Sequence, residues 1–431
     1  MKIASVKGFH DVLPGESARW AWLENCAREV FRRYHFREIR IPIVERTELF
    51  RRSIGDATDI VEKEMYTFAD LDGSSLTLRP EGTAGVVRAY VEHSWWLQEP
   101  VAKLFYLGPM FRRERPQKGR LRQFHQIGAE VLGREDPAID ADVILLVHDL
   151  LSALGLPAFS LELNSLGDEN CRPAYREELR RFAQAHEDAL CDNCRRRLQR
   201  NPLRLLDCKI ASCRHVMADA PVIVDHLCDP CRAHFDVVRQ LLGKMSVPYR
   251  LEPRMVRGLD YYVRTAFEVT APGLGAQNAV GGGGRYDSLV RDLGGPETPG
   301  IGFAFGVERL MIALGAAQAE IDERPDLFVI PLDREAEIQV LELARRWRQQ
   351  GLRIDVGTSQ RSLKSQMRAA DKQGVRVVAI VGEAERAGAA ATLRDMVAKR
   401  DLPQAVPFAW SAEQVRAFLT ELQLPETAAS V

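Results

Sequence analysis

The stretch FRRERPQKGRLRQFHQ, residues 111–126, decides how we expect the chain to fold. A strand-like run at 102–107 enters it, and a second run at 124–132 leaves it. The connection is too short for a crossover helix, so two antiparallel strands joined by a loop are expected. Between 112 and 122 the loop has a local charge of +5, from six cations and one acid: Arg112, Arg113, Arg115, Lys118, Arg120 and Arg122 against Glu114.

This basic loop suits a polyphosphate, because guanidinium groups bind phosphate oxygens in bidentate fashion and stay charged. A solvated charged hairpin is the alternative interpretation of any basic loop. The composition does not decide between them. The chain has 431 residues with 59 basic and 60 acidic side chains, a net charge of -1, and a net charge hides its own distribution.

The residues before 325 predict an α+β fold. Apolar residues at helical spacing mark a helix at 16–35, and an apolar run at 143–147 is typical of a buried helix. Several strand-like runs are separated by turns rather than by crossover helices, so an antiparallel sheet is expected. These runs lie at 39–44, 76–78, 102–107, 161–164 and 266–270.

Two glycine-rich segments follow in the sequence. The segment PGIGFAFGVERL, residues 299–310, predicts an apolar strand that passes into a helix, with Arg309 near the helix start. The segment GGGGRYD, residues 281–287, is neither a dinucleotide fingerprint nor a Walker loop, because no βαβ context and no Gly-Lys-Ser/Thr accompany it.

Composition shifts divide the chain into a first domain at 1–325 and a second at 326–431. An inserted subdomain at about 167–250 holds seven of the eight cysteines. The second domain shows a β-α-β-α-β pattern and is expected to be a compact α/β domain. The chain shows no leader segment and no run of 18 apolar residues, so we expect a cytoplasmic protein without membrane contact.

The cysteines of the inserted subdomain have the spacing of a zinc site in two Cys-x2-Cys pairs. Six thiols leave the ligand set ambiguous, and reduced structural cysteines with no metal are the favoured interpretation. A structural zinc stays open as the alternative. The six are Cys191, Cys194, Cys208, Cys213, Cys228 and Cys231.

Together these segments resemble class II aminoacyl-tRNA synthetases, and the resemblance covers nearly the whole chain. Arg112 with Glu114 is similar to motif 2 of that class, and 300–309 is similar to motif 3. Pro42 fits the proline of motif 1, which in the class belongs to the dimer interface. More specific are signature segments similar to those of histidyl-tRNA synthetases, RGLDYY at 257–262 and GGGRYD at 282–287, with support from LRPEGT at 78–83 and NSLGD at 164–168.

The resemblance implies a class II antiparallel sheet flanked by helices, with an insertion and a C-terminal α/β anticodon-binding domain. It implies activation of L-histidine by ATP to histidyl-adenylate, with Mg²⁺, and transfer of the histidyl group to tRNA(His) by a homodimer. A non-catalytic synthetase-like regulatory subunit of histidine biosynthesis is the main alternative. A synthetase-like sensor of uncharged tRNA is a further one, although no effector segment is present.

The resemblance also implies roles for individual residues. Arg112 is expected to hold the α-phosphate and the histidine carboxylate, Arg309 the γ-phosphate, and Arg257 to act as an electrostatic catalyst. Glu114 and Arg120 complete the expected ATP site. These positions answer a chemical need, since attack of a carboxylate on the α-phosphate requires neutralisation of the phosphorus centre and of the leaving pyrophosphate.

Histidine itself requires acceptors for its ammonium group and an orienting group for its imidazole. By family position, Glu81, Thr83 and Gln126 are expected around the amino group, and Glu130 and Tyr262 at the imidazole. The remaining residues expected to contact histidine are Gly82, Arg112, Arg257 and Tyr261. In the C-terminal domain, the segment SLKSQMRAADK at 362–372 predicts a basic helical stripe for tRNA phosphates, or alternatively a solvated face, formed by Lys364, Arg368 and Lys372.

Overall fold

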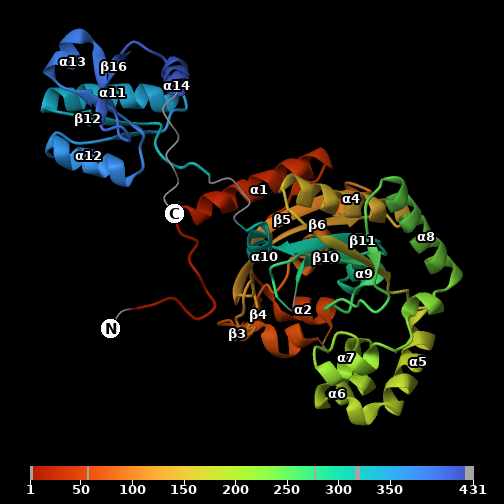
Figure 1. The fold of residues 1–431 in the computed structure, drawn as a ribbon. Helices are drawn as coiled ribbons and strands as arrows, with labels where there is room; N and C mark the ends of the chain where they lie inside the picture. The colour runs from red at the N-terminus through yellow and green to blue at the C-terminus, as the bar shows by residue number, and fades with distance from the viewer. Residues whose placement is uncertain (1–2, 56–57, 276–277, 316–320, 423–431) are drawn as a thin grey trace. The chain divides into compact units, whose positions relative to one another are not determined.

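The computed structural model describes residues 3–55, 58–275, 278–315 and 321–422. The chain divides into two compact units, residues 1–320 and 321–431. Figure 1 shows the elements of both units.

The first unit is built on an eight-stranded sheet with the order β1-β5-β6-β11-β10-β9-β7-β8. The six central strands pair antiparallel with one another, while the two short edge strands pair parallel, β1 with β5 and β8 with β7. The antiparallel α+β prediction is therefore confirmed. The strands are β1 Arg37–Glu38, β5 Ala102–Phe111, β6 Gln123–Leu132, β7 Ser160–Ser165, β8 Arg250–Leu251, β9 Val263–Thr270, β10 Ala279–Arg285 and β11 Gly300–Gly306.

Helices cover both faces of this sheet (Figure 1). The largest apolar core packs α1 (Glu16–Arg33), α4 (Pro137–Ala153) and the second half of α8 (Asp229–Lys244) against one face. On the other face, α3 (Thr83–Glu92) and the short α9 (Leu289–Asp292) pack over a second core. The helix α10 (Val307–Leu314) continues directly from β11, as 299–310 predicted.

The prediction of a strand over 39–44 is wrong. A small sheet contains β2 (Val44–Arg46), β4 (Ser75–Leu78) and β3 (Tyr66–Ala69), and residues 39–43 are not in a strand. Pro42 cannot donate a ladder hydrogen bond, which interrupts strand pairing here. The buried Arg79 guanidinium donates instead to the carbonyl oxygens of Ile41 (2.6 Å) and Pro42 (3.3 Å), where a neighbouring strand would otherwise bond.

The inserted segment forms a helical lobe with its own apolar core. Its elements include α5 (Arg172–Ala185), α6 (Asp192–Arg200) and α7 (Ala211–Met217). The next helix, α8, contributes Cys231 to the lobe core but Phe235, Val238 and Leu242 to the main core. We therefore propose that the lobe ends within α8 rather than near residue 250.

The second unit has a five-stranded sheet in the order β13-β12-β14-β15-β16. Parallel pairing of β12 (Leu327–Pro331) with β13 (Ile354–Val356) and β14 (Val377–Val381) confirms the predicted α/β arrangement. The antiparallel strands β15 and β16 were not predicted from sequence. The remaining elements are α11 (Arg334–Gln349), α12 (Leu363–Lys372), α13 (Glu383–Gly388), β15 (Ala390–Asp395), β16 (Arg400–Pro407) and α14 (Ala412–Glu421).

Among the helices of the described ranges, none has both the length and the apolar character needed to cross a membrane.

Candidate active site

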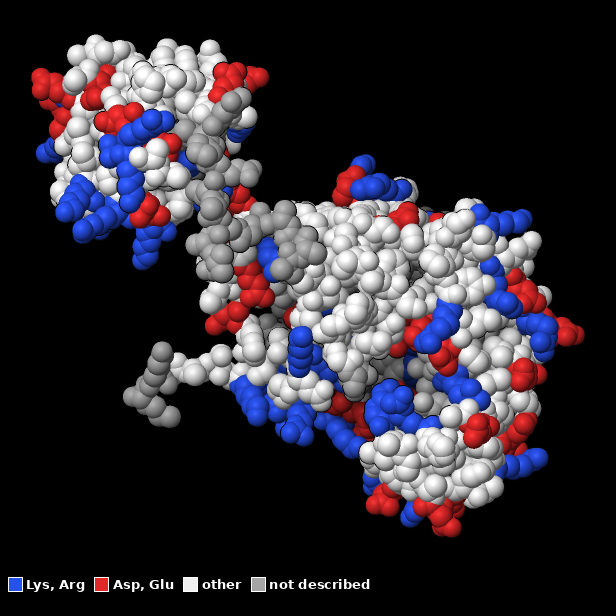
Figure 2. All heavy atoms as spheres, viewed as in Figure 1, with Lys and Arg blue, Asp and Glu red and all other residues white. Residues whose placement is uncertain are grey.

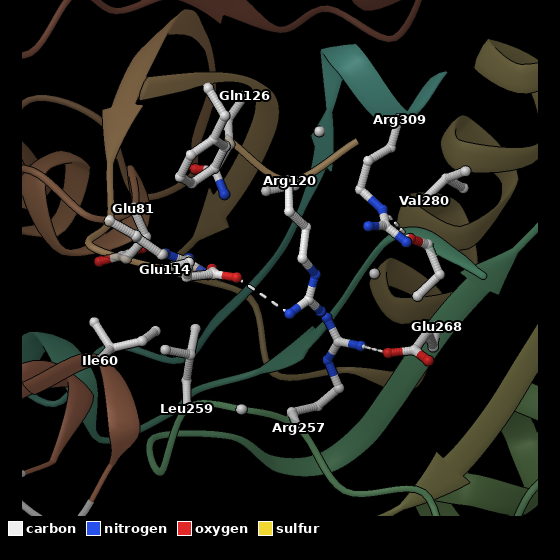
Figure 3. Close-up of a pocket in the computed structure, with 18 of the residues that line it drawn as sticks. Ile60, Glu81, Glu114, Arg120, Gln126, Arg257, Leu259, Glu268, Val280 and Arg309 are labelled. Atoms are coloured by element: carbon white, nitrogen blue, oxygen red, sulfur yellow. Dashed lines mark hydrogen bonds and ion pairs between the residues drawn. The ribbon is translucent and has the colours of Figure 1, made fainter. Parts of the chain in front are cut away.

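A cavity of about 250 Å³ lies in the first unit. It is lined from several segments that are far apart in the sequence, and Figure 3 shows how their side chains face one another. Two parts can be distinguished by charge. The cationic end contains Arg120, Arg257 and Arg309, and the acid-lined end is the part around Glu81. The predicted site residues that line it are Glu81, Thr83, Arg112, Glu114, Arg120, Gln126, Arg257, Tyr261, Tyr262 and Arg309.

Three guanidinium groups converge on the cationic end from three parts of the chain (Figure 3). Arg120 comes from the loop between β5 and β6, Arg257 from the segment before β9, and Arg309 from the first turn of α10. Glu114 in the same loop accepts a hydrogen bond from Arg120 at 3.1 Å. The basic loop is therefore folded against the pocket rather than being only a solvated hairpin.

Arg112 is held from two sides at the start of this loop. Its Nε donates to the Pro80 carbonyl oxygen at 2.8 Å, and its guanidinium lies 5.1 Å from the ring centroid of Phe124. Glu114 is 3.7 Å from it, at the long end of ion-pair distances. These contacts fix the direction of the guanidinium and leave other N–H donors for a ligand.

Arg257 pairs with Glu268, which stands on β9 and also lines the cavity. Burial acts to lower the pKa of Arg257, but the Glu268 carboxylate raises it above its usual range. The Nε atom of Arg257 is buried and has no hydrogen-bond partner within the described residues. A charged side chain that is held by one carboxylate and still has an unused donor is suited to an anionic ligand.

Arg309 donates from Nε to the carbonyl oxygen of Ala279 at 2.5 Å. Burial, and then the positive charge of Arg120, lower the pKa of Arg309. The guanidinium still remains protonated at neutral pH, because the usual pKa of an arginine side chain lies far above neutrality. The like charges are therefore held close together, which is favourable once an anion lies between them.

Glu81 marks the acid-lined end and caps α3. Its two carboxylate oxygens accept from the backbone N–H groups of Thr83 (2.7 Å) and Ala84 (2.9 Å), at the positive end of the helix dipole. Burial raises the pKa of Glu81, although both N–H donors act to lower it. The sequence LRPEGT therefore places this carboxylate by a local capping interaction.

Glu130 is fully buried beneath the cavity rather than on its wall. Its oxygens accept hydrogen bonds from the hydroxyls of Thr83 (2.6 Å) and Tyr286. Burial raises its pKa to about 8, which the two hydroxyl donors only partly oppose. Gly302, its partner across the β6–β11 ladder, makes room for it, because a Cβ there would lie 1.7 Å from Oε2.

Gly82 does not line the cavity either. A Cβ at this position would lie 2.2 Å from the ring of Tyr106, so the glycine allows close packing of α3 on the sheet. Gly128 meets the same ring from β6, where a Cβ would come within 2.3 Å. The position of Gly82 therefore supports a role in packing more directly than the contact with histidine that is expected from sequence.

Gln126 provides an unused acceptor on the cavity wall. Its Oε1 is buried and has no hydrogen-bond partner among the residues that the structure describes. Tyr261 and Tyr262 line the same cavity, both buried, with ring centroids 4.7 Å apart. A buried amide oxygen without a protein partner is expected where a ligand donates a hydrogen bond.

The glycine-rich signature 281–287 has two functions in the structure. Its glycines allow close strand packing, since a Cβ at Gly283 would lie 2.0 Å from the carbonyl oxygen of Gly302. Arg285, which is fully buried, points away from the cavity and pairs with Asp140 at 2.6 Å and Asp287 at 2.8 Å. This arginine has a structural role.

Glu268 was not identified from sequence. The signal available was one charged residue within the otherwise uncharged run 266–271. That signal does not distinguish a strand residue facing solvent from one facing a cavity. Only the placement of Arg257 opposite it shows which applies.

Comparison with protein families follows the two units. The model described as "Histidyl-tRNA synthetase" matches residues 8–310, and the "Anticodon binding domain" model matches residues 326–417.

Full-length relatives are similar throughout. A protein of Geobacter metallireducens named histidine–tRNA ligase is 53% identical over 394 residues, covering 91% of this chain and 95% of that protein. One of the same name from Anaeromyxobacter dehalogenans is 51% identical over 407 residues, covering 94% and 98%. The crystal structure of apo Staphylococcus aureus histidyl-tRNA synthetase is 34% identical, with a TM-score of 0.79, and covers 97% of this chain and all of that one.

Proposed function

Because this chain belongs to the histidyl-tRNA synthetase family, we propose that its cavity activates L-histidine with ATP and passes the histidyl group to tRNA(His). The chain is a class II aminoacyl-tRNA synthetase with histidine–tRNA ligase activity. The observation that carries the assignment to this cavity is the convergence of Arg120, Arg257 and Arg309 opposite the acid-lined end.

The cationic end is suited to the first reaction step. The histidine carboxylate attacks the α-phosphorus of ATP, the bond to the pyrophosphate oxygen breaks, and pyrophosphate leaves with its negative charge. We assign Arg112 to the α-phosphate and the histidine carboxylate, Arg257 to the charge that develops at the α-phosphate, and Arg309 to the γ-phosphate. Fixed guanidinium groups stabilise such charge without reorganising during the reaction.

Magnesium is the metal we expect with ATP. It favours carboxylate oxygens together with substrate phosphates and retained water. Glu114 and Glu268 are carboxylates on the cavity wall close to the arginines, and they would hold it. When bound, the ion neutralises phosphate charge. Glu114 and Arg120 would in addition orient the nucleotide.

The acid-lined end is suited to histidine. Glu81, Thr83 and Gln126 offer acceptors for its ammonium group, and Tyr262 with the buried Glu130 would orient its imidazole. Glu130 acts here through Thr83 and Tyr286, which it holds in place. A site with buried polar groups left unpaired by the wrong side chain discriminates by about 10⁴-fold or more.

The family favours a catalytic enzyme over the regulatory-subunit alternative, because the anticodon-binding unit is present. The test is histidine-dependent exchange of pyrophosphate into ATP, followed by charging of tRNA(His). We expect both reactions. Absence of exchange in well-folded protein would reject the enzyme, and exchange that another amino acid supports equally well would reject the histidine assignment.

The C-terminal unit is proposed to contact tRNA through α12. Lys364, Arg368 and Lys372 are exposed on one face of this helix, and Figure 2 shows basic side chains gathered where Figure 1 labels α12. Each phosphate contact contributes to the salt dependence of binding. Replacing all three residues by Ala should weaken charging more at 50 mM than at 200 mM salt, because the variant has fewer salt-sensitive phosphate contacts, while leaving pyrophosphate exchange unchanged. Unaltered charging would exclude this face.

A homodimer is also proposed. Pro42, Ile43 and Val44 form an exposed apolar segment, and such surface is typical of an interface. Sedimentation of the purified protein should give a dimer, and Ile43→Asp should dissociate it. A monomeric parent protein would exclude the dimer. A variant that remains fully dimeric would place the interface elsewhere.

A further inference from the structure

Four cysteines of the inserted lobe come together although the chain between them is long. The Sγ atoms of Cys191, Cys194, Cys208 and Cys213 all lie within 4.8 Å of one another. The distance between Cys191 and Cys208 is 3.9 Å. Four sulfurs at the corners of a tetrahedron around a zinc, with Zn–S bonds of about 2.3 Å, would be about 3.8 Å apart. The thiols therefore already approximate a tetrahedral ligand set.

A second group of the same kind lies at the base of the lobe. It contains Cys171, Cys228, Cys231 and one carboxylate, Asp168, again with all ligand atoms within 4.8 Å of one another. Asp168 Oδ1 is 3.9 Å from the Cys228 sulfur. The cysteine spacing did not identify Cys171 or Asp168 as a metal ligand. Their partners Cys228 and Cys231 follow about 60 residues later in the chain, so no short motif joins them.

The two groups share their local architecture. Cys191 is the N-cap residue of α6 and Cys228 is the N-cap residue of α8, each followed three residues later by a second cysteine inside the helix. In both groups the N-cap cysteine donates its backbone N–H to a sulfur of its own group, Cys191 to Cys213 (3.2 Å) and Cys228 to Cys171 (3.1 Å). Such bonds stabilise thiolate charge, and a thiolate is the form that binds a metal.

We propose that the inserted lobe binds two zinc ions, one in a Cys₄ site (Cys191, Cys194, Cys208, Cys213) and one in an Asp-Cys₃ site (Asp168, Cys171, Cys228, Cys231). All four protein ligands are present in each site, which leaves no open position for substrate. Closed sites of this kind are structural. This proposal does not depend on the proposed reaction.

Reduced thiols without a metal are the competing explanation. The lobe has a small apolar core of its own, and cysteine sulfurs form a large part of it. A single packing cysteine needs no polar partner, but eight ligand atoms sorted into two sets of four are a more specific arrangement than packing requires. Small lobes with little apolar core commonly depend on a metal for stability.

The two sites would brace the segment that carries Arg257. Next to the Asp-Cys₃ site, Arg172 donates to the carbonyl oxygens of Leu166 (3.0 Å) and Tyr262. Just before Cys208 of the other site, Arg204 donates to the carbonyl oxygen of Arg257 at 3.1 Å and pairs with Asp260 at 2.6 Å. Loss of either ion should therefore loosen residues 255–262.

The first test is the metal content of full-length protein purified without chelator or affinity metal. We expect about two zinc per chain. Cys194→Ser and Cys231→Ser should each retain about one, and the double variant none. Cys26→Ser is the matched control, because Cys26 lies on α1 outside both groups, and it should retain two.

A second measurement does not depend on whether the variants fold. Wild-type protein reconstituted with Co²⁺ should show thiolate-to-cobalt charge transfer and the intense d–d bands of tetrahedral coordination, saturating at two equivalents. Hydrogen exchange of peptides from 255–262 should rise when the zinc is removed and fall when it is restored.

Several results would overturn the proposal. Folded wild-type protein with no bound metal, and with its lobe thiols reactive toward a thiol reagent without denaturant, would establish reduced structural cysteines. A decrease in protein mass that corresponds to disulfide formation would instead establish that the lobe cysteines are oxidised in pairs. Iron in place of zinc would reject the identity of the ion, and a single zinc would reject one of the two sites.

Discussion

Burial shifts pKa values in opposite directions at the two ends of the cavity. Burial lowers the pKa of Arg309 at the cationic end and raises the pKa of Glu130 beneath the acid-lined end to about 8. An arginine starts so far above neutrality that it stays charged, whereas a glutamate starts low enough that burial brings its titration to neutral pH. One end is thus permanently positive, and the other has a charge that depends on pH.

This difference explains how each end is built. Arg257 at the cationic end is held by the Glu268 carboxylate, and its Nε has no hydrogen-bond partner among the described residues. Glu130 instead has both oxygens occupied by hydroxyl donors and no direct access to the cavity. Replacing a residue of the cationic end should therefore affect mainly activity, and replacing one around Glu130 should affect mainly stability and its pH dependence.

The largest expected effect is the contribution of Glu130 to stability. The carboxyl titrates near 4.5 when unfolded and near 8 when folded, so the folded protein binds the extra proton between these values. The free energy of unfolding therefore falls as pH rises from 4.5 to 8, by up to about 5 kcal/mol from this group. Glu130→Gln should remove that dependence, as measured by urea unfolding at pH 5 and pH 8.

The matched control is Glu135→Gln, an exposed carboxyl three residues after the end of β6, which should unfold like the wild type at both pH values. A Glu130→Gln protein that retains the full wild-type pH dependence would show that Glu130 is ionised in the folded state at neutral pH.

Arg257→Ala is expected to have the next largest effect. Loss of one fixed charge at the reacting phosphate should reduce pyrophosphate exchange by 10²- to 10³-fold, or about 3 to 4 kcal/mol, while the protein stays folded. Arg250→Ala is the control, since this arginine forms an exposed ion pair with Glu162 in the neighbouring strands. Near-normal exchange by the Arg257 variant would refute its role.

Tyr286→Phe should have the smallest effect. The variant removes one hydroxyl donor from Glu130 and should raise the pKa of that carboxyl further, because the donor favours the ionised form. A hydrogen bond to a charged group is worth about 1.5 to 3 kcal/mol of stability, and a neutral one about 1 kcal/mol. Urea unfolding should show the larger loss at pH 9, where Glu130 is ionised, and the smaller loss at pH 6.

The same change at Tyr34 tests whether the effect belongs to the buried carboxyl. Tyr34 donates to Asp149 at 2.6 Å on the surface, and Tyr34→Phe should alter stability little at either pH. Equal losses in the two variants, or a larger loss at pH 6 than at pH 9 for Tyr286→Phe, would contradict the assigned interaction.

Much of the fold could be predicted from local patterns. The β5–β6 hairpin, the β11–α10 junction and the parallel strands of the second unit have periodicities that their own residues determine. Residues 39–43 could not be predicted, because the partner of their carbonyl groups is the side chain of Arg79, which lies distant in sequence. The strands β15 and β16 were missed because both contain charged residues and β16 also contains two prolines, so neither forms an apolar run.

The candidate site shows the same division. Its arginines and the capping glutamate stand in motifs that the sequence displays, so they could be named in advance. Glu268 required knowledge of which way a strand residue points. The position of Glu130 beneath the cavity depends on contacts between segments separated by many residues. The same is true of the two groups of four ligands that seven cysteines and Asp168 form.

Gly302 sets a limit for anyone who wishes to engineer this protein to accept a different amino acid. It provides the empty space that Glu130 occupies, with the nearest oxygen 1.7 Å from where a Cβ would stand. A library that varies the residues around the acid-lined end must leave this position unchanged, because even alanine would displace the glutamate. Redesign of the acid-lined end is therefore best confined to the residues of the cavity wall, with Gly302 left unchanged.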